Sequence, residues 1–104
     1  MVFVGEKVMS DNLIEAQKAI AAVCDQVRDI LLDKNRKYGN SALEPKRVFS
    51  KSPTIEQLNV RIDDKLSRIE SAQGDDTEDP ELDLIGYLIL KRVARVMQQH
   101  EERT

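Results

Sequence analysis

Three groups of polar residues have the chemistry to bind a phosphorylated ligand. The first is the stretch KNRKYGNS, residues 34 to 41, which combines ammonium, amide, phenol and hydroxyl groups beside a glycine. An aromatic ring next to amide and hydroxyl groups suits a base or sugar that carries phosphate. Cations at a helix end also have a structural explanation, because they offset the partial negative charge of the last carbonyls. The candidate ligand-binding residues of this group are Lys34, Asn35, Lys37, Tyr38, Asn40 and Ser41.

The second group lies in RIDDKLSRIE, residues 61 to 70. Arg61, Lys65 and Arg68 are separated by four and three residues, so they share one face of a helix. Guanidinium groups offer forked donors that match phosphate oxygens, and Asp64 between them could orient them or hold a metal ion. The alternative is an exposed series of ion pairs, which contributes little to stability.

The third group follows along the chain and is acidic. Asp79, Asp83 and Tyr87 recur at four-residue intervals, which places them along one edge of a helix. Asp79 lies where a helix would begin, and a carboxylate there has a structural role. Asp83 precedes an apolar run, so its carboxylate needs a cationic, hydrogen-bonding or metal partner. We expect that partner to be Arg61, Lys65 or Arg68.

Apolar residues recur at three- and four-residue intervals in three stretches, which predicts helices at about residues 12 to 38, 54 to 72 and 80 to 97. The stretch LIGYLIL in the third helix is apolar nearly all round, so we expect it to be covered on more than one side, and a second copy of the chain could cover it. The predicted buried stripes comprise Leu13, Ala16, Ile20, Val23, Cys24, Val27, Ile30 and Leu31; Ile55, Leu58, Ile62, Leu66 and Ile69; and Leu82, Ile85, Leu88, Ile89, Val93, Val96 and Met97.

Capping residues predict where these helices begin and end. Asn12 with Glu15, and Thr54 with Gln57, have the spacing of a capping box. Asp79 followed by Pro80 is a strong helix start, and Gly39 supplies a left-handed helix end. Residues 39 to 53 have no periodicity and contain two prolines, so they form a long loop of the kind that is usually functional. Residues 74 to 79 form an acidic turn.

With 104 residues the chain has room for one domain. We predict an N-terminal extension over residues 1–11 that adds a short strand or a cover, a helical domain over residues 12–97 and a polar tail over residues 98–104. The aromatic fraction is only 4%, which favours a core of aliphatic residues and helix-on-helix packing. The predicted fold is an all-α three-helix bundle that is completed by oligomerisation.

Charge and composition exclude several classes of function. A net charge of −3 argues against duplex nucleic acid as the main partner. Cys24 is the single cysteine, so it cannot form an internal disulfide, and its place in an apolar stripe predicts a buried thiol in a reducing compartment. The sequence contains no run of about 18 apolar residues, which a membrane span would require, so we expect a cytoplasmic protein. The only histidine, His100, lies in the polar tail and supports neither a catalytic triad nor a zinc site.

Taken in order, KNRKYGNS, RIDDKLSRI and EDPELDLIGYLIL resemble the phage and bacterial family called nucleotide modification associated domain. The resemblance spans roughly residues 31 to 90. That family is distantly similar to the all-α MazG-type nucleotide pyrophosphohydrolases, in which carboxylates on two helices hold magnesium. It therefore implies a MazG-like helical fold, and a host-cell cytoplasmic location if the chain is phage-encoded.

The pattern departs from MazG-type enzymes, because Lys65 and Arg68 lie where a second carboxylate is expected. Phosphate binding by Arg61, Lys65 and Arg68 is thereby favoured over a multi-metal centre, and Tyr87 is a further candidate ligand-binding residue. Three functions stay open: a protein that recognises or sequesters a nucleotide-derived ligand, a magnesium-dependent pyrophosphohydrolase, and a helical interaction module. Asp64, Asp79 and Asp83 would be the metal ligands of the second. Whether the chain is an enzyme is left undecided by its sequence.

Overall fold

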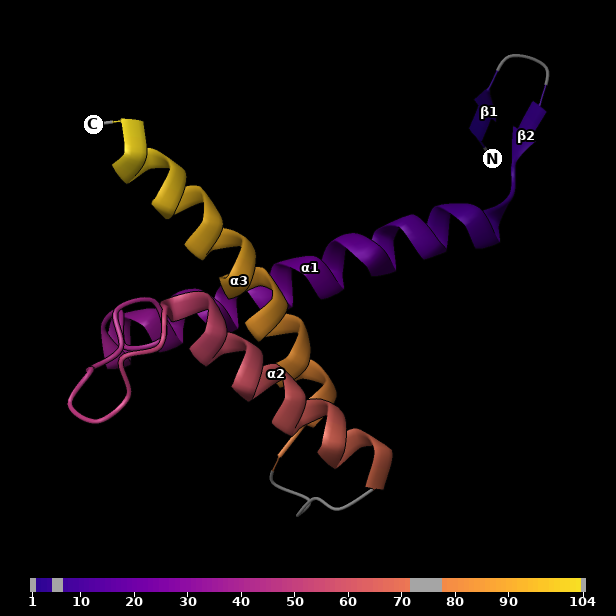
Figure 1. The fold of residues 1–104 in the computed structure, drawn as a ribbon. Coiled ribbons are helices and arrows are strands. Elements are labelled where there is room, and N and C mark those ends of the chain that lie inside the picture. The colour runs from indigo at the N-terminus through magenta and orange to yellow at the C-terminus, as the bar shows by residue number, and fades with distance from the viewer. Residues whose placement is uncertain (1, 5–6, 72–77, 104) are drawn as a thin grey trace. The chain divides into compact units, whose positions relative to one another are not determined.

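The computed structural model describes residues 2–4, 7–71 and 78–103. Its elements are β1 (Val2–Val4), β2 (Lys7–Met9), α1 (Asp11–Tyr38), α2 (Thr54–Ser71) and α3 (Pro80–Arg103) (Figure 1). The predicted all-α fold with three helices is confirmed. Most of the acidic turn predicted for residues 74 to 79 lies outside the described residues. The chain divides into two compact units, Met1–Asp33 and Lys34–Thr104, and each is described by itself.

The first unit contains the hairpin and most of α1. The two strands pair antiparallel, with Val2 opposite Met9, so part of the N-terminal extension forms strands. The cap of α1 differs from the prediction: Ser10 Oγ accepts a hydrogen bond from the Leu13 backbone N–H at 3.1 Å, and the helix begins one residue before Asn12. A serine hydroxyl three residues ahead of an amide is a favourable cap, and it replaces the predicted capping box.

The predicted apolar stripe of α1 is mostly uncovered. Val27 is buried with 4% of its surface exposed, whereas Ile20 and Val23 are 63% and 51% exposed. Cys24 is exposed too, so the prediction of a buried thiol is wrong. The predicted stripe of α1 is therefore buried at Val27 and exposed at Ile20, Val23 and Cys24.

The second unit begins with the end of α1. Gly39 has a φ of 60°, the left-handed conformation that ends a helix at low cost, as predicted. The backbone N–H groups of Leu43 and Glu44 both donate to the Asn40 carbonyl, at 2.9 and 2.6 Å, and form a turn. The remainder of the loop carries no regular structure before α2 begins.

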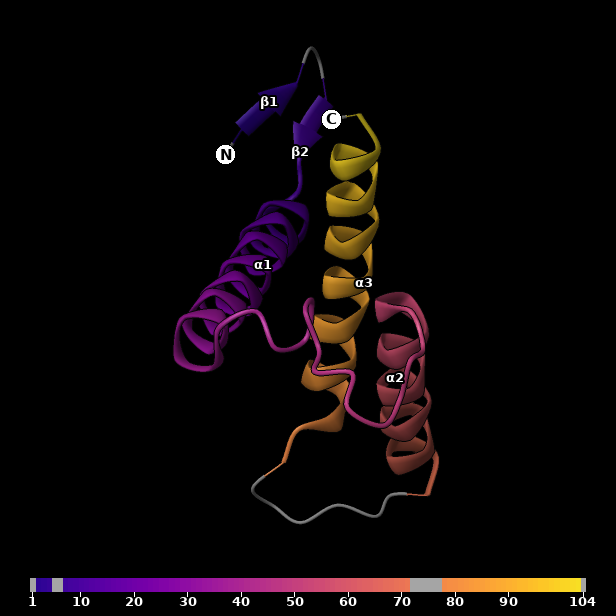
Figure 2. The same cartoon turned by 60° about the vertical axis from the view of Figure 1, so that its left-hand side comes forward.

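Helices α2 and α3 lie side by side and antiparallel in both views (Figures 1 and 2). The core of this pair is built on Leu58 and Ile62 of α2, which are 1% and 8% exposed. On α3, Ile85 is half-buried and Gly86 is buried. Leu58 and Ile62 are one helical turn apart, so they fix which turn of α2 packs against which turn of α3. This packing in turn sets which polar residues of the two helices face each other.

The predicted cap is present at the start of α3 but not at the start of α2. Asp79 Oδ1 accepts a hydrogen bond from the Leu82 backbone N–H at 3.0 Å, which confirms Asp79 as the cap of α3. Thr54 does not form the predicted capping box, because its hydroxyl is engaged by the preceding loop. Helix α3 also continues to Arg103, so residues 98–103 are helical instead of forming an irregular tail. They contain neither glycine nor proline, and glutamine, glutamate and arginine are good helix formers.

Large apolar side chains remain uncovered in the second unit as well. On α2, Leu66 and Ile69 are 49% and 40% exposed, although they belong to the predicted stripe. On α3 the exposed set comprises Leu88, Ile89, Val93 and Val96. The stripe of α2 is thus buried only in its first half, and these apolar side chains of α3 are exposed.

Candidate functional site

Asp83 is the centre of the candidate site. Its carboxylate forms ion pairs with Lys65 Nζ at 3.4 Å and Lys34 Nζ at 3.7 Å. The predicted pairing of Asp83 with a cation of the second helix is confirmed, with Lys65 as that cation. Asp83 and Lys65 are largely sheltered, with 26% and 12% of their side-chain surfaces exposed, whereas Lys34 is 56% exposed. One carboxylate therefore holds two ammonium groups, one sheltered and one open to solvent.

One turn earlier on α2 and one turn later on α3, Arg61 meets Tyr87. The guanidinium carbon lies 5.8 Å from the centroid of the ring, and Arg61 Nη1 donates to the phenol oxygen at 3.5 Å. A cation over an aromatic face at this distance is attracted by the ring quadrupole. The contact holds the guanidinium beside α3, and it leaves other N–H donors of Arg61 to point elsewhere.

In the opposite direction along α2, Arg68 binds two carboxylates. Its Nε lies 3.1 Å from Asp64 Oδ2, and its Nη1 lies 2.5 Å from Glu78 Oε2. Arg68 thus joins α2 to the residue that precedes the cap of α3. These ion pairs are half-exposed, so each contributes at most about 1 kcal/mol to stability.

We call these three sets of contacts the charged ladder. Its rungs are Arg61 with Tyr87, Lys65 with Asp83 and Lys34, and Arg68 with Asp64 and Glu78. The ladder holds four cationic groups and three carboxylates, so it carries an excess of one positive charge. The excess lies toward Arg61 and Lys34, because Arg68 is matched by two carboxylates.

Other members of the KNRKYGNS stretch have local roles. Asn35 Nδ2 donates to Asn40 Oδ1 at 2.8 Å and to the Gly39 carbonyl at 3.4 Å, so the two amides fasten the end of α1 to the loop. Tyr38 is 69% exposed, which means that its ring is not packed within the ladder. Ser41 is also exposed. Lys37, the remaining candidate of the stretch, is exposed as well and has an interaction partner.

The three candidate metal ligands each have a different partner. Asp64 binds Arg68, Asp79 caps α3, and Asp83 binds the two lysines. Within residues 2–4, 7–71 and 78–103, no three side chains of His, Cys, Asp or Glu gather as a metal site. The proposed magnesium ligands stay a prediction.

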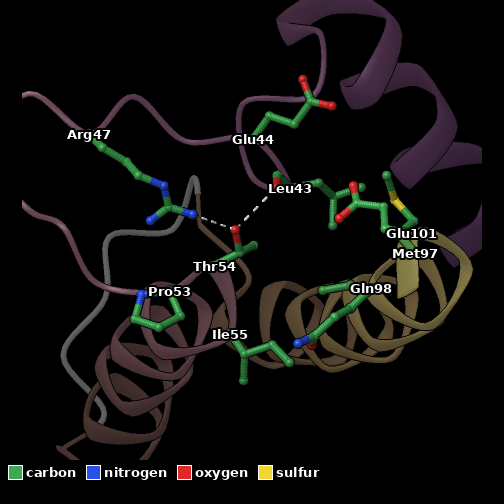
Figure 3. A pocket seen from close by; sticks show the side chains of 10 residues that line it. Leu43, Glu44, Arg47, Pro53, Thr54, Ile55, Met97, Gln98 and Glu101 are labelled. Atoms are coloured by element: carbon green, nitrogen blue, oxygen red, sulfur yellow. Dashed lines mark hydrogen bonds between the residues drawn. The ribbon is translucent and has the colours of Figure 1, made fainter. Parts of the chain in front are cut away.

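A cavity that was not predicted lies between the loop and the last turns of α3 (Figure 3). Its volume is about 270 Å³, and its lining includes Leu43, Ile55 and Met97. At its edge the Arg47 guanidinium donates to Thr54 Oγ1 at 2.9 Å and to the Ser52 carbonyl, and the Thr54 hydroxyl donates to the Leu43 carbonyl at 3.3 Å. The length of the loop indicated that it is functional. The loop has no periodicity, however, so its sequence does not predict which side chains line the cavity.

The described helices contain no segment long and apolar enough to span a membrane. Comparison with models of known protein families found no match, and comparisons with curated proteins and with solved structures found none either. The resemblance to the nucleotide modification associated domain therefore stays a prediction, and the site must be interpreted from its own geometry.

Asp79 provides a test of its role as the cap of α3. Asp79→Ala should lower the free energy of unfolding by about 1 kcal/mol, because the Leu82 amide loses its acceptor, whereas Asp79→Asn should retain most of the stability. Urea denaturation of both variants measures this difference. If Asp79→Asn is as unstable as Asp79→Ala, the side chain does more than cap the helix.

Proposed function

We propose that the protein binds a phosphorylated, nucleotide-like ligand at the charged ladder. The observation that carries this proposal is the Lys34, Asp83 and Lys65 rung, where one carboxylate holds two ammonium groups. Two cations on one anion leave a positive charge that an incoming phosphate can neutralise. The resemblance of the surrounding motifs to a nucleotide-associated family supports the same ligand class.

The arrangement of the rung suits an exchange of partners. Lys34 is more than half exposed and lies 3.7 Å from Asp83, so it can turn toward a phosphate without breaking the inner pair. Lys65 is sheltered and stays on Asp83, which fixes its position. Arg61, one turn away, supplies N–H donors in the fork geometry that phosphate oxygens accept. The ligand is thus met by Lys34, which can turn toward it, and by Lys65 and Arg61, which are held in place.

A magnesium-dependent pyrophosphohydrolase is the second activity that the resemblance implies. Two of the predicted metal ligands, Asp64 and Asp83, are part of the charged ladder. Each is paired with a cation, Asp64 with Arg68 and Asp83 with the two lysines. Magnesium that entered with a nucleoside triphosphate would compete with these cations for the carboxylates. Release of pyrophosphate from bound nucleotide in the presence of magnesium would add this catalysis to the binding function.

The ligand is tested by thermal unfolding with ribo- and deoxyribonucleoside triphosphates and inorganic tripolyphosphate, each with and without magnesium. A ligand at 100 times its Kd stabilises the folded state by about 2.7 kcal/mol, so the melting temperature should rise by several degrees. Lys34→Gln should weaken binding about tenfold through loss of a charged hydrogen bond, with little change in the unliganded melting temperature.

Lys18→Gln is the matched control for that experiment. Lys18 is also exposed and pairs with one carboxylate, Glu15, at 3.6 Å, but it lies outside the ladder. It should keep the affinity of the unchanged protein. Equal losses in the two lysine variants would show that only net charge matters, and the absence of stabilisation by every phosphate compound would refute the proposed function.

We also propose that the protein forms a homo-oligomer, which is supported by the uncovered apolar residues. Ile89, Val93 and Val96 recur along one side of α3 and are 38%, 36% and 64% exposed. An apolar stripe of this kind marks an association surface when it is left uncovered. A second copy of the chain can bury the same stripe symmetrically.

Val93→Glu should therefore shift the protein toward the monomer, because a buried unpaired carboxylate is costly. Sedimentation equilibrium at several protein concentrations measures the mass. Gln99→Glu adds the same charge to an exposed position of α3 and should leave the mass unchanged. A monomeric mass for the unchanged protein at all concentrations would rule out the oligomer.

A further inference from the structure

The loop before α2 presents an aromatic side chain to solvent. Phe49 is 96% exposed, and the neighbouring Val48 is 68% exposed. Lys46 and Arg47 precede these two residues and Lys51 follows them, so an apolar pair lies among three cations. We call this segment, from Lys46 to Lys51, the loop tip. Aromatic and arginine side chains contribute much of the binding energy of protein interfaces, so the loop tip has the chemistry of an interaction surface.

Hydrogen bonds close the loop tip at its base. The Arg47 guanidinium donates to the Ser52 carbonyl and to Thr54 Oγ1. Lys51 Nζ donates to the Arg47 carbonyl at 2.6 Å. Both ends of the tip are therefore tied to each other and to the start of α2, while the ring of Phe49 lies in solvent.

The cavity between the loop and the last turns of α3 has room for an aromatic ring (Figure 3). Its volume is about 270 Å³. An apolar cavity of about 150 Å³ is enough to bind benzene, so a phenyl ring fits within this volume. Leu43, Ile55 and Met97 line the cavity. A ring that entered would leave water and contact aliphatic and thioether groups, which is favourable.

The charges of the cavity and the loop tip are opposite in sign. Glu44, Glu101 and Arg47 are the charged residues among the described lining, so two carboxylates and one guanidinium give it a net charge of −1. The loop tip has three cations and no carboxylate. A basic, aromatic tip and an acidic, apolar cavity are complementary, and the same chain supplies both.

We infer that Phe49 of one copy of the chain inserts into this cavity of a second copy. The inference rests on the proposed homo-oligomer, since it names a segment that crosses between the copies. Because the tip is tied at Arg47 and the ring is 96% exposed, Phe49 does not occupy the cavity of its own chain. Val93 and Met97 are one turn apart on α3, so the cavity adjoins the exposed stripe through which association is proposed.

Phe49→Ser should raise the dissociation constant of the oligomer at least about tenfold, because the ring no longer leaves water on association. Its melting temperature as a monomer should change little, since Phe49 is almost fully exposed in the single chain. Sedimentation equilibrium of the full chain measures the dissociation constant. Val60→Ser is the matched control, since it removes an apolar side chain of α2 that is 68% exposed, and it should change the constant by less than about twofold.

Cross-linking identifies the contact itself. The background is Cys24→Ser, which removes the exposed native thiol. Phe49→Cys protein is mixed with Met97→Cys protein that carries an affinity tag, and a short bis-maleimide is added. A species with the mass of one tagged and one untagged chain should form. Gln99→Cys in place of Met97→Cys puts the thiol at an exposed position of α3 outside the cavity lining, and should give much less of this species.

The results separate this inference from the proposed homo-oligomer. An oligomer whose dissociation constant is unchanged by Phe49→Ser, or equal cross-linking from Met97→Cys and Gln99→Cys, would overturn the insertion of Phe49 and leave association through the α3 stripe unaffected. A monomeric mass at all concentrations, without cross-linked chains, would overturn both.

Discussion

The arrangement of the second unit depends on one sheltered carboxylate. Asp83 lies on α3 where the chain turns from polar to apolar, and a carboxylate with little exposure requires cationic or hydrogen-bonding partners. Lys65 of α2 and Lys34 from the end of α1 meet this requirement from two separate segments. The two ion pairs that stabilise the carboxylate also bring two ammonium groups together. The contacts that hold the fold here are therefore the same ones that we propose bind phosphate.

The apolar contacts of α2 and α3 place this carboxylate. Leu58 and Ile62 are the buried residues of α2, and they fix which turn of one helix faces which turn of the other. With that register, Arg61 meets Tyr87 and Lys65 meets Asp83 on successive turns. A shift by one residue would rotate the cations by about 100° and separate them from α3. Small changes in the packing of the pair would therefore alter the ladder as a whole.

Much of this could be predicted from residue spacing. The three helices, the left-handed Gly39, the Asp79 cap and the pairing of Asp83 follow from periodicity, backbone preference and the cost of a sheltered charge. Periodicity and backbone preference act between residues that are close in the sequence, and the cost of sheltering a charge applies to every carboxylate. The cap of α1 was misassigned because Ser10 and Asn12 are both good capping residues, and local propensity does not choose between them.

What the sequence could not predict depends on contacts across the fold. Periodicity places Cys24 on the apolar side of α1 but does not show whether that side is buried, and Cys24 is exposed. The engagement of Thr54 by Arg47, and the cavity beside α3, arise from a loop whose path is set by individual hydrogen bonds. Aperiodic segments carry no repeating signal, so the residues that they bring together become apparent only in three dimensions.

The central claim is that phosphate binds between Lys34 and Lys65, and NMR of the lysine side chains tests it most directly. Their Cε–Hε signals can be assigned with single Lys→Arg variants and followed while ATP or tripolyphosphate is added. We expect the signals of Lys34 and Lys65 to shift together and saturate, while that of Lys18 stays in place. Saturating shifts confined to other lysines, or no shift in either residue of the pair, would contradict it.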